Sequence, residues 1–349
     1  MSAFSPAARG PNPLRGWQVD RSAIRCVGVD LQRPECVLAQ SDGTLWTADA
    51  RGGVMRIGHD GSQQLIAQRG QKPEAGAKSP EDLILRGTLP NGIALDANGN
   101  FFIANFGTDA IEFMERDGTT RTLYTELDGV PLGKMNFALR DDTGRLWFTV
   151  TTRQQPWTRN INEKVADGYL LLLDGRGLRI VADGFVGTNE CRLDARGEWL
   201  YVVESNARRI SRLRVGPGGT LSHREVFGPP DLGGVPDGFA FDAYGNLWIT
   251  LVVADRLIAL TPEGELLTLL DDGDANQVAE FDRHFLAGTV TTELMAATRG
   301  TLAPWMASIT FGGPDLRTVY LGSLLGTTLP SFRSPVPGLP LPHWNEVRR

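Results

Sequence analysis

The stretch Asp-Ala-Tyr-Gly-Asn-Leu-Trp, at residues 242–248, decides the fold because its pattern recurs along the chain. Each copy places a glycine turn shortly before a group of large apolar residues that heads a strand. The copies end at Trp46, Phe102, Trp147, Tyr201, Trp248 and, in a degraded form, Tyr320. Successive copies lie roughly 45 to 56 residues apart, with one step near 72, and a repeat of this length is typical of a solenoid or a propeller.

The sequence around each glycine turn predicts antiparallel strands. A short apolar run precedes the turn, as at 238–242, and two more runs follow it, as at 54–57 and 64–67. Asp60-Gly61 separates the last two runs, and such a dipeptide favours a tight hairpin because its residues accept positive φ. We therefore predict an all-β fold, a six-bladed β-propeller with four antiparallel strands per blade.

The repeats also predict the domain organisation. We expect a single propeller domain at 17–329, preceded by a flexible N-terminal segment at 1–16 and followed by a Pro-rich C-terminal tail at 330–349. Three stretches interrupt the period, at 69–88, 151–167 and 271–306. The last contains a run with short-helix character at 279–285 and is expected to be either a lid or a subunit contact.

The composition limits the possible partners. The 349 residues carry 35 Lys and Arg against 41 Asp and Glu, so the formal net charge is 35 − 41 = −6. This acidic excess argues against nucleic acid or a membrane surface as a partner, because binding phosphate groups needs concentrated Lys and Arg. Residues 1–15 lack the apolar core of a secretory signal, and three irregularly spaced cysteines are typical of reduced thiols, so we expect a cytoplasmic protein. The sequence leaves the oligomeric state open.

In a propeller, the residues just before the innermost strands converge on one mouth of the central channel. Five of the six repeats place a side-chain oxygen there, at Glu35, Asn91, Asn136, Asn189 and Asp237. Oxygen ligands suit a hard divalent cation such as Ca²⁺, Mg²⁺ or Mn²⁺, whose charge would also keep two facing carboxylates from repelling each other. Asn and Asp favour turns for backbone reasons as well, but their recurrence at equivalent points predicts a metal site at this mouth. Only four histidines are present, without an HExxH motif, which disfavours a histidine-ligated zinc site.

Several short motifs around these residues resemble one known family. Thr-Asn ends at residue 189, Pro-Asp-Gly spans 236–238, and Phe-Gly-Gly spans 311–313 before an aromatic strand. Together they resemble the SMP-30/gluconolactonase/luciferin-regenerating-enzyme (LRE)-like family over roughly residues 30–328. The resemblance implies a six-bladed propeller that hydrolyses lactones with one catalytic divalent metal ion in the channel mouth.

The resemblance also implies a role for each matched residue. Glu35, Asn189 and Asp237 would be the metal ligands, and Asn136 would be a fourth ligand or a substrate contact. Ca²⁺ is the expected ion, with Zn²⁺, Mg²⁺, Mn²⁺ and Fe²⁺ as alternatives. In the metal-assisted hydrolysis of a small-molecule lactone or ester, the cation would stabilise the carbonyl oxygen and Asp237 would be the general base.

Three positions depart from the family's pattern. Lys134 stands in place of an arginine, so it keeps a cation that can orient a substrate oxygen but loses the planar guanidinium. Phe137 replaces a carboxylate that would bind sugar hydroxyls. We therefore expect a substrate less polar than a simple sugar lactone, with Phe137 and Trp157 as apolar walls and Asn91 as a further contact. Glu190 replaces a glycine, and we expect it on the blade surface.

Other function classes stay open. The same metal site would also serve an arylesterase or a phosphotriesterase, and a propeller with a structural cation would bind a ligand without catalysis. No Gly-x-Ser-x-Gly motif occurs in the sequence, which argues against a serine esterase. Glu204 is expected on an inner strand of the fourth repeat, outside the site.

Overall fold

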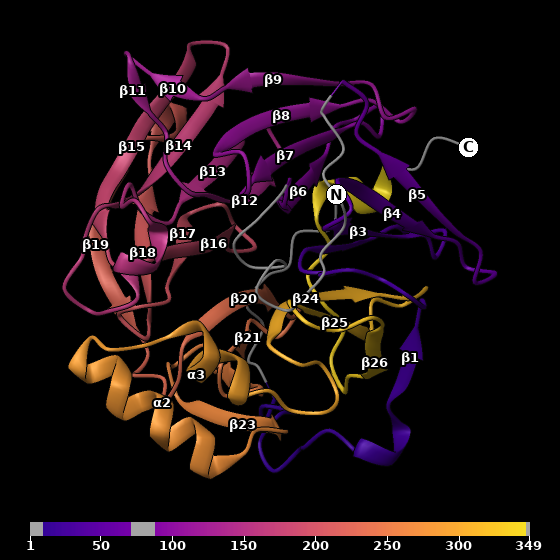
Figure 1. Ribbon diagram of the computed structural model, residues 1–349. Helices are drawn as coiled ribbons and strands as arrows, with labels where there is room; N and C mark the ends of the chain where they lie inside the picture. The colour runs from indigo at the N-terminus through magenta and orange to yellow at the C-terminus, as the bar shows by residue number, and fades with distance from the viewer. Residues whose placement is uncertain (1–9, 71–87, 347–349) are drawn as a thin grey trace.

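The computed structural model describes residues 10–70 and 88–346, which form six four-stranded antiparallel sheets arranged as the blades of a propeller (Figure 1). The predicted all-β six-bladed propeller with four antiparallel strands per blade is therefore confirmed. In the first five blades the strands follow one another from the innermost outward in chain order. No helix in these described ranges is long and apolar enough to cross a membrane.

The first five blades each use four consecutive strands. Blade one consists of β2 (Val37–Ala39), β3 (Leu45–Asp49), β4 (Gly53–Ile57) and β5 (Gln63–Ala67). Blade two consists of β6 (Pro90–Leu95), β7 (Phe101–Asn105), β8 (Ala110–Met114) and β9 (Thr120–Tyr124). Blade three consists of β12 (Met135–Arg140), β13 (Leu146–Val150), β14 (Gly168–Asp174) and β15 (Gly177–Phe185). Blade four consists of β16 (Thr188–Leu193), β17 (Trp199–Glu204), β18 (Arg209–Val215) and β19 (Leu221–Phe227), and blade five of β20 (Pro236–Phe241), β21 (Leu247–Leu251), β22 (Arg256–Leu260) and β23 (Leu266–Asp271).

Blade six joins the two ends of the propeller. Its inner strands are β24 (Met306–Gly312), β25 (Thr318–Ser323) and β26 (Leu329–Arg333), and its outermost strand is β1 (Arg25–Val27) from the start of the chain. Cys26 pairs with Pro330 in this sheet. Because β26 extends to Arg333, the blade continues past the boundary expected at residue 329.

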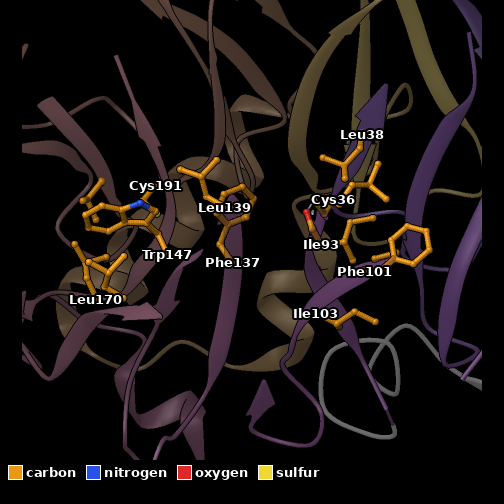
Figure 2. Close-up of a cluster of buried hydrophobic side chains, with 14 of the residues drawn as sticks. Cys36, Leu38, Ile93, Phe101, Ile103, Phe137, Leu139, Trp147, Leu170 and Cys191 are labelled. Carbon is orange, nitrogen blue, oxygen red and sulfur yellow. Dashed lines mark hydrogen bonds between the residues drawn. The ribbon is translucent and has the colours of Figure 1, made fainter. Parts of the chain in front are cut away.

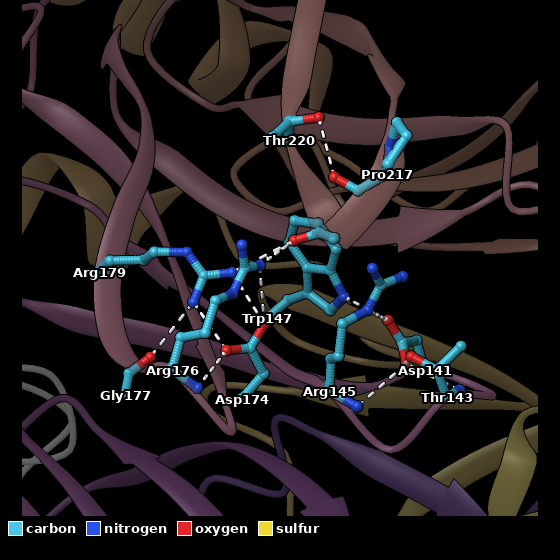
Figure 3. A network of polar contacts seen from close by, with 11 residues as sticks. Asp141, Thr143, Arg145, Trp147, Asp174, Arg176, Gly177, Arg179, Pro217 and Thr220 are labelled. Carbon is cyan, nitrogen blue, oxygen red and sulfur yellow. Dashed lines mark hydrogen bonds and ion pairs between the residues drawn. The ribbon is translucent and has the colours of Figure 1, made fainter.

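The recurring glycine turn is held by a side-chain contact (Figure 3). The carboxylate of Asp141 accepts hydrogen bonds from the Thr143 backbone N–H at 2.9 Å and from the Trp147 indole Nε1 at 2.9 Å. The equivalent pairs are Asp242 with Trp248 (2.9 Å) and Gln40 with Trp46 (2.7 Å). Asp141 and Asp242 close the turn as well as binding the indole, whereas Asp42 accepts the turn N–H next to Gln40. In all three cases the indole donor is satisfied, so these tryptophan rings pack between blades without an unpaired polar group.

The core lies between neighbouring blades, so both faces of a blade are covered. Trp46, Trp147 and Trp248 are buried, and Cys36 and Cys191 lie in the same inner layer as Phe137 (Figure 2). Burial raises the pKa of the Cys36 thiol to about 12 and raises that of Cys191 as well. Because the faces of the blades are packed against each other, a site that binds a small molecule is expected at the strand ends, around the channel mouths.

The insertions behave differently from one another. The first, at 69–88, lies mostly outside the described residues. The second, at 151–167, carries the short 3₁₀ helix η2 (Trp157–Asn160). The third carries α2 (Ala275–Ala287) and α3 (Thr292–Ala297), which lie together at one side of blade five (Figure 1). The short helix expected at 279–285 is therefore part of a longer one, which Asp274 caps at its N-terminus and Gly288, at φ 70°, ends.

The chain ends pack against the propeller where the structure describes them. Leu14 is 1% exposed, and Asn12 Nδ2 donates to Asn246 Oδ1 at 2.6 Å, so residues 12–14 are held against blade five. The tail ends in the 3₁₀ helix η4 (Pro342–Asn345), where His343 Nε2 lies 3.2 Å from the Ala39 carbonyl oxygen. Three short elements lie outside the blades: η1 (Arg21–Ala23), η3 (Pro217–Gly219) and the hairpin of β10 (Glu126–Leu127) with β11 (Val130–Pro131).

Candidate active site

Four of the predicted site residues occupy the same position in four blades. Asn91, Asn136, Asn189 and Asp237 are each the second residue of an innermost strand. In each strand the pairing register shifts at this point, for example between Pro236 and Phe239. A β-bulge turns a side chain away from its regular direction. The irregularity therefore aims these four side chains at the channel mouth.

The structure brings the five predicted oxygen-bearing residues to one cavity of about 850 Å³, a volume that includes its opening to solvent. Its polar floor is formed by Arg33, Glu35, Asn91, Asn136, Asn189, Ser205 and Asp237. Its walls are mainly apolar and come from blade loops and from the two long insertions. Such a combination, an apolar cavity with a few convergent polar groups, is typical of a small-molecule site.

Hydrogen bonds fix Glu35 on one side of the floor. Asn91 Nδ2 donates to Glu35 Oε1 at 2.6 Å and to the Asn136 carbonyl oxygen at 3.0 Å. Arg33 Nη2 lies 2.8 Å from Glu35 Oε2 and donates to Asn91 Oδ1 at 2.5 Å. Because the polar atoms of Asn91 already have partners in the protein, its side chain orients Glu35 and lies on the cavity floor rather than standing free for a substrate.

The carboxylates at the mouth are strongly desolvated. Asp237 is 5% exposed, and burial raises its pKa well above the usual value, with Glu35 and Glu190 adding to the effect and an Asn189 hydrogen bond opposing it. Burial likewise raises the pKa of Glu35, while the Arg33 guanidinium and the Asn91 amide lower it. Negative charges crowded in a dry site favour a cation or a proton between them.

Glu190 differs from the sequence prediction, because it is 3% exposed and lies enclosed against blade five rather than on the blade surface. Its Oε2 lies 3.1 Å from Arg192 Nη2 and accepts from the Phe239 backbone N–H at 3.3 Å. Burial raises the pKa of Glu190 to about 7. The reason is that the blade face on which it lies is covered by blade five, so a residue facing away from the mouth is still enclosed.

Two amide oxygens at the mouth lack partners. Asn136 Oδ1 and Asn189 Oδ1 are buried without a hydrogen bond, and an unsatisfied buried acceptor costs about 1–3 kcal/mol. No group of three or more His, Cys, Asp and Glu side chains within residues 10–70 and 88–346 is arranged to hold a metal ion. The predicted set instead combines two carboxylates with two amides. Its oxygen donors and its charge of two fit a hard divalent cation, which would also satisfy the unpaired amides.

Lys134 and Phe137 do not line the cavity, unlike the expectation from the sequence. Lys134 Nζ lies 2.8 Å from Asp109 Oδ1 and donates to the Phe106 carbonyl oxygen at 3.1 Å. Phe137 is 2% exposed in the inner layer, where the Arg192 guanidinium lies 5.3 Å from its ring centroid. The register shift between Met135 and Ala138 separates the direction of Asn136 from that of its neighbours. Lys134 is therefore held by blade two, and Phe137 is a core residue.

Trp157 lines the cavity, with its ring 5.3 Å from that of Phe106 in an edge-to-face arrangement. Glu204 lies outside the cavity. It is fully buried, and its Oε2 accepts from the Val186 backbone N–H at 2.9 Å and lies 3.0 Å from Arg224 Nη2. Glu204 thus binds the edge of its own blade.

Several cavity residues were not identified from the sequence. Arg33 directly precedes Pro34, and its left-handed backbone (φ 52°) accompanies a guanidinium that lies in the floor. Phe281 and Phe285 line the wall from α2. Their spacing of four residues inside the stretch with helical character is the signal that one helix face is apolar. Ser205, Met295 and Trp305 left no comparable signal.

Comparisons with known proteins confirm the resemblance inferred from the motifs. The model of the SMP-30/Gluconolactonase/LRE-like region matches residues 116–279. A 6-deoxy-6-sulfogluconolactonase of Pseudomonas putida is 25% identical over 198 residues, which cover 56% of this chain and 55% of that protein. The chain spans about half the length of the curated relatives it matches.

Solved structures share the fold along most of the chain. A gluconolactonase of Xanthomonas campestris aligns with a TM-score of 0.61 and 20% identity, covering 90% of each chain. A calcium-binding protein, regucalcin, of Agrobacterium tumefaciens aligns with a TM-score of 0.63 and 15% identity, covering 91% of this chain and 95% of that one. At such low identity the likeness establishes the propeller fold alone.

Proposed function

We propose that this propeller, whose residues 116–279 form an SMP-30/gluconolactonase/LRE-like region, is an enzyme that hydrolyses a lactone with the help of one bound divalent cation. The observation that carries the proposal is the convergence of Glu35, Asn136, Asn189 and Asp237 at one desolvated channel mouth. Relatives and neighbours named as lactonases support the reaction class.

Glu35, Asn136, Asn189 and Asp237 would hold the cation through oxygen atoms. Ca²⁺ is the first candidate, supported by the neighbour described as a calcium-binding protein, and Zn²⁺, Mg²⁺, Mn²⁺ and Fe²⁺ are alternatives for an all-oxygen site. When bound, the cation supplies Lewis-acid polarisation of the ester carbonyl and a lower pKa for a coordinated water molecule.

The protein's own side chains would transfer the proton and orient the reacting groups. Asp237 accepts a proton as the water oxygen bonds to the carbonyl carbon, and the ring C–O bond then breaks. The proton passes to the leaving alkoxide, so that the product is a hydroxy acid. Asn189 orients the Asp237 carboxylate through a hydrogen bond, and the Arg33 guanidinium opposes the rise in the pKa of Glu35 that burial causes. A ligating carboxylate is a weaker base than a free one, so this role of Asp237 is part of what the experiment tests.

The cavity walls support a substrate less polar than a simple sugar lactone. Phe106, Trp157, Phe281, Phe285 and Trp305 all face the cavity. Sugar hydroxyls placed against the faces of these rings would lose hydrogen bonds to water, and this loss is costly wherever no polar atom of the protein replaces them. An apolar face loses nothing by the same transfer.

The test is a pH-stat assay of protein stripped with EDTA, with divalent ions returned one at a time. Substrates are a sugar lactone, an alkyl lactone, a phenyl ester and a phosphotriester. Asp237→Asn is compared with Asp315→Asn, a control at a surface carboxylate that pairs with Arg333. We expect ion-restored lactone hydrolysis that Asp315→Asn keeps and Asp237→Asn loses by at least a hundredfold, on the order of removing a general base.

The outcomes separate the competing functions. Faster turnover of the phenyl ester or phosphotriester would assign the site to an arylesterase or phosphotriesterase. No turnover of any substrate by folded protein that binds the ion would refute catalysis and leave a ligand-binding propeller with a structural cation.

A further inference from the structure

The cavity is divided between a polar floor and an apolar compartment beneath the 271–306 insertion. The floor is formed by residues of the innermost strands β6, β12, β16 and β20, together with Arg33 and Glu35 just before β2 and Ser205 just after β17. The compartment is lined by Phe281 and Phe285 of α2, by Met295 of α3 and by Trp305, opposite Trp157 from the other insertion. Phe281 and Phe285 stack with ring centroids 5.9 Å apart and an interplanar angle of 25°.

The 271–306 insertion is ordered by contacts within itself and with the neighbouring blades. Asp274 accepts from the N–H groups of Asn276 and Gln277 at the start of α2. Arg208 Nη1 lies 3.1 Å from Asp282 Oδ1, which ties the middle of α2 to blade four. Trp305 Nε1 donates to the Met295 carbonyl oxygen at 3.1 Å, which ties α3 to blade six. The apolar compartment is therefore formed before any ligand binds, and little ordering entropy opposes binding.

The apolar lining of the compartment determines which kind of substituent can bind beneath α2. The empty space of about 850 Å³ includes the opening of the cavity to solvent. A lactone ring seated at the floor lies against the polar residues there, so the apolar lining beneath α2 is left for a substituent on that ring. Most of the compartment is hydrocarbon and aromatic carbon. A hydroxylated substituent would be desolvated there, whereas an alkyl or aryl substituent would be removed from water at a gain.

We infer that the 271–306 insertion forms a substituent-binding subsite, and that the substrate is a lactone carrying an alkyl or aryl group that lies against Phe281, Phe285 and Met295. This inference rests on the proposed lactone hydrolysis and adds the substrate class and the residues that select it. The ring then lies over Glu35 and Asp237, and the substituent points away from them beneath α2.

The kinetic test uses γ-lactones with tails of zero to eight carbons, and a sugar lactone, on the metal-restored enzyme. In the wild type, kcat/KM should rise about fourfold with each added methylene until the compartment is full. Met295→Gln places an amide of similar volume in the wall and should lower kcat/KM for the tailed lactones about tenfold, mainly through KM. Leu286→Ala, at a 62% exposed position on the outer face of α2, should keep the wild-type dependence on tail length.

A second measurement does not depend on catalysis. Binding of 2-alkyl tetrahydrofurans to EDTA-stripped protein is followed by tryptophan fluorescence, since Trp157 and Trp305 line the cavity. In the wild type, the affinity should rise with tail length, and in Met295→Gln it should rise less steeply. In Phe285→Leu, the tail that binds with the highest affinity should be longer than in the wild type. A sugar lactone hydrolysed as fast as the tailed lactones, or affinity independent of tail length, would overturn the subsite. Tail-dependent binding without hydrolysis of any lactone would instead overturn the proposed reaction and keep the subsite.

Discussion

Replacing Arg33 by methionine should destabilise the ion-free protein strongly. Arg33 is 5% exposed, and its Nη2 lies 2.8 Å from Glu35 Oε2. Methionine retains much of the apolar stem but removes the charge, so the buried Glu35 and Asp237 lose the cation nearest to Glu35. Removing one partner of a buried ion pair typically costs about 3–5 kcal/mol. We expect a loss of this size in the free energy of unfolding when EDTA is present.

A divalent ion should return part of this stability. The variant lacks a like charge near the ion and should therefore bind it more tightly than the wild type. A tenfold lower Kd would reduce the loss by about 1.4 kcal/mol at saturating ion. The pH dependence has a defined sign, because burial already raises the pKa of Glu35 above its ordinary 4.5 and Arg33 opposes this. Without Arg33 the loss should be smallest below pH 4.5 and grow as the pH rises through the folded-state pKa.

The assay is urea unfolding of wild type, Arg33→Met and Arg333→Met, with EDTA and with Ca²⁺, at several pH values. Arg333 pairs with Asp315 at the surface, so its replacement should cost at most about 1 kcal/mol and should not depend on the ion. A loss below 1 kcal/mol for Arg33→Met in EDTA, or an equal loss with and without Ca²⁺, would show that Arg33 does not balance the charge of the site.

Two further predictions concern buried groups away from the cavity. His343 is enclosed at the opposite mouth, and burial, with Arg140 and Arg192 nearby, lowers its pKa from 6.5 to about 4. The neutral imidazole stabilises the fold fully above pH 6.5, and about 3 kcal/mol of the free energy of unfolding should be lost as the pH falls through 4. Urea unfolding of His343→Gln should show a weaker dependence of this free energy on pH between these two values. A dependence equal to that of the wild type would contradict the lowered pKa of His343. Of the three thiols, exposed Cys26 should react with Ellman's reagent in the native protein, while Cys36 and Cys191 should react only in urea; three fast thiols in the native state would contradict the packing between blades.

The fold was predictable because the repeat has a local cause. A single acceptor such as Asp141 closes the turn and binds the indole of Trp147 six residues later, so the pattern survives in the sequence wherever the contact is made. The converging side chains were predictable for a related reason. Asn136, Asn189 and Asp237 take the same place in their strands, and their period follows that of the blades.

Other features depend on contacts that no local pattern records. Phe137 directly follows Asn136 in β12, yet its ring lies in the inner core layer while Asn136 lines the cavity. Glu190 is enclosed by the neighbouring blade through Phe239, which lies 49 residues further along the chain. Arg33 lies in the site because Glu35, Asn91 and the Pro90 carbonyl surround its guanidinium. These placements follow from how blades meet, which the residues of one blade do not specify.

The pairing of β1 with β26 has a consequence for how the chain is made. Arg25–Val27 is among the first strands to leave the ribosome, yet its partner, Leu329–Arg333, is among the last. During synthesis the edge of β1 has no partner, and five blades can stack as an open arc before the sixth is complete. The distance across the channel mouth is set only when that arc closes. Residues from blades one and five, such as Glu35 and Asp237, therefore depend on the pairing of β1 with β26 for their positions across the mouth.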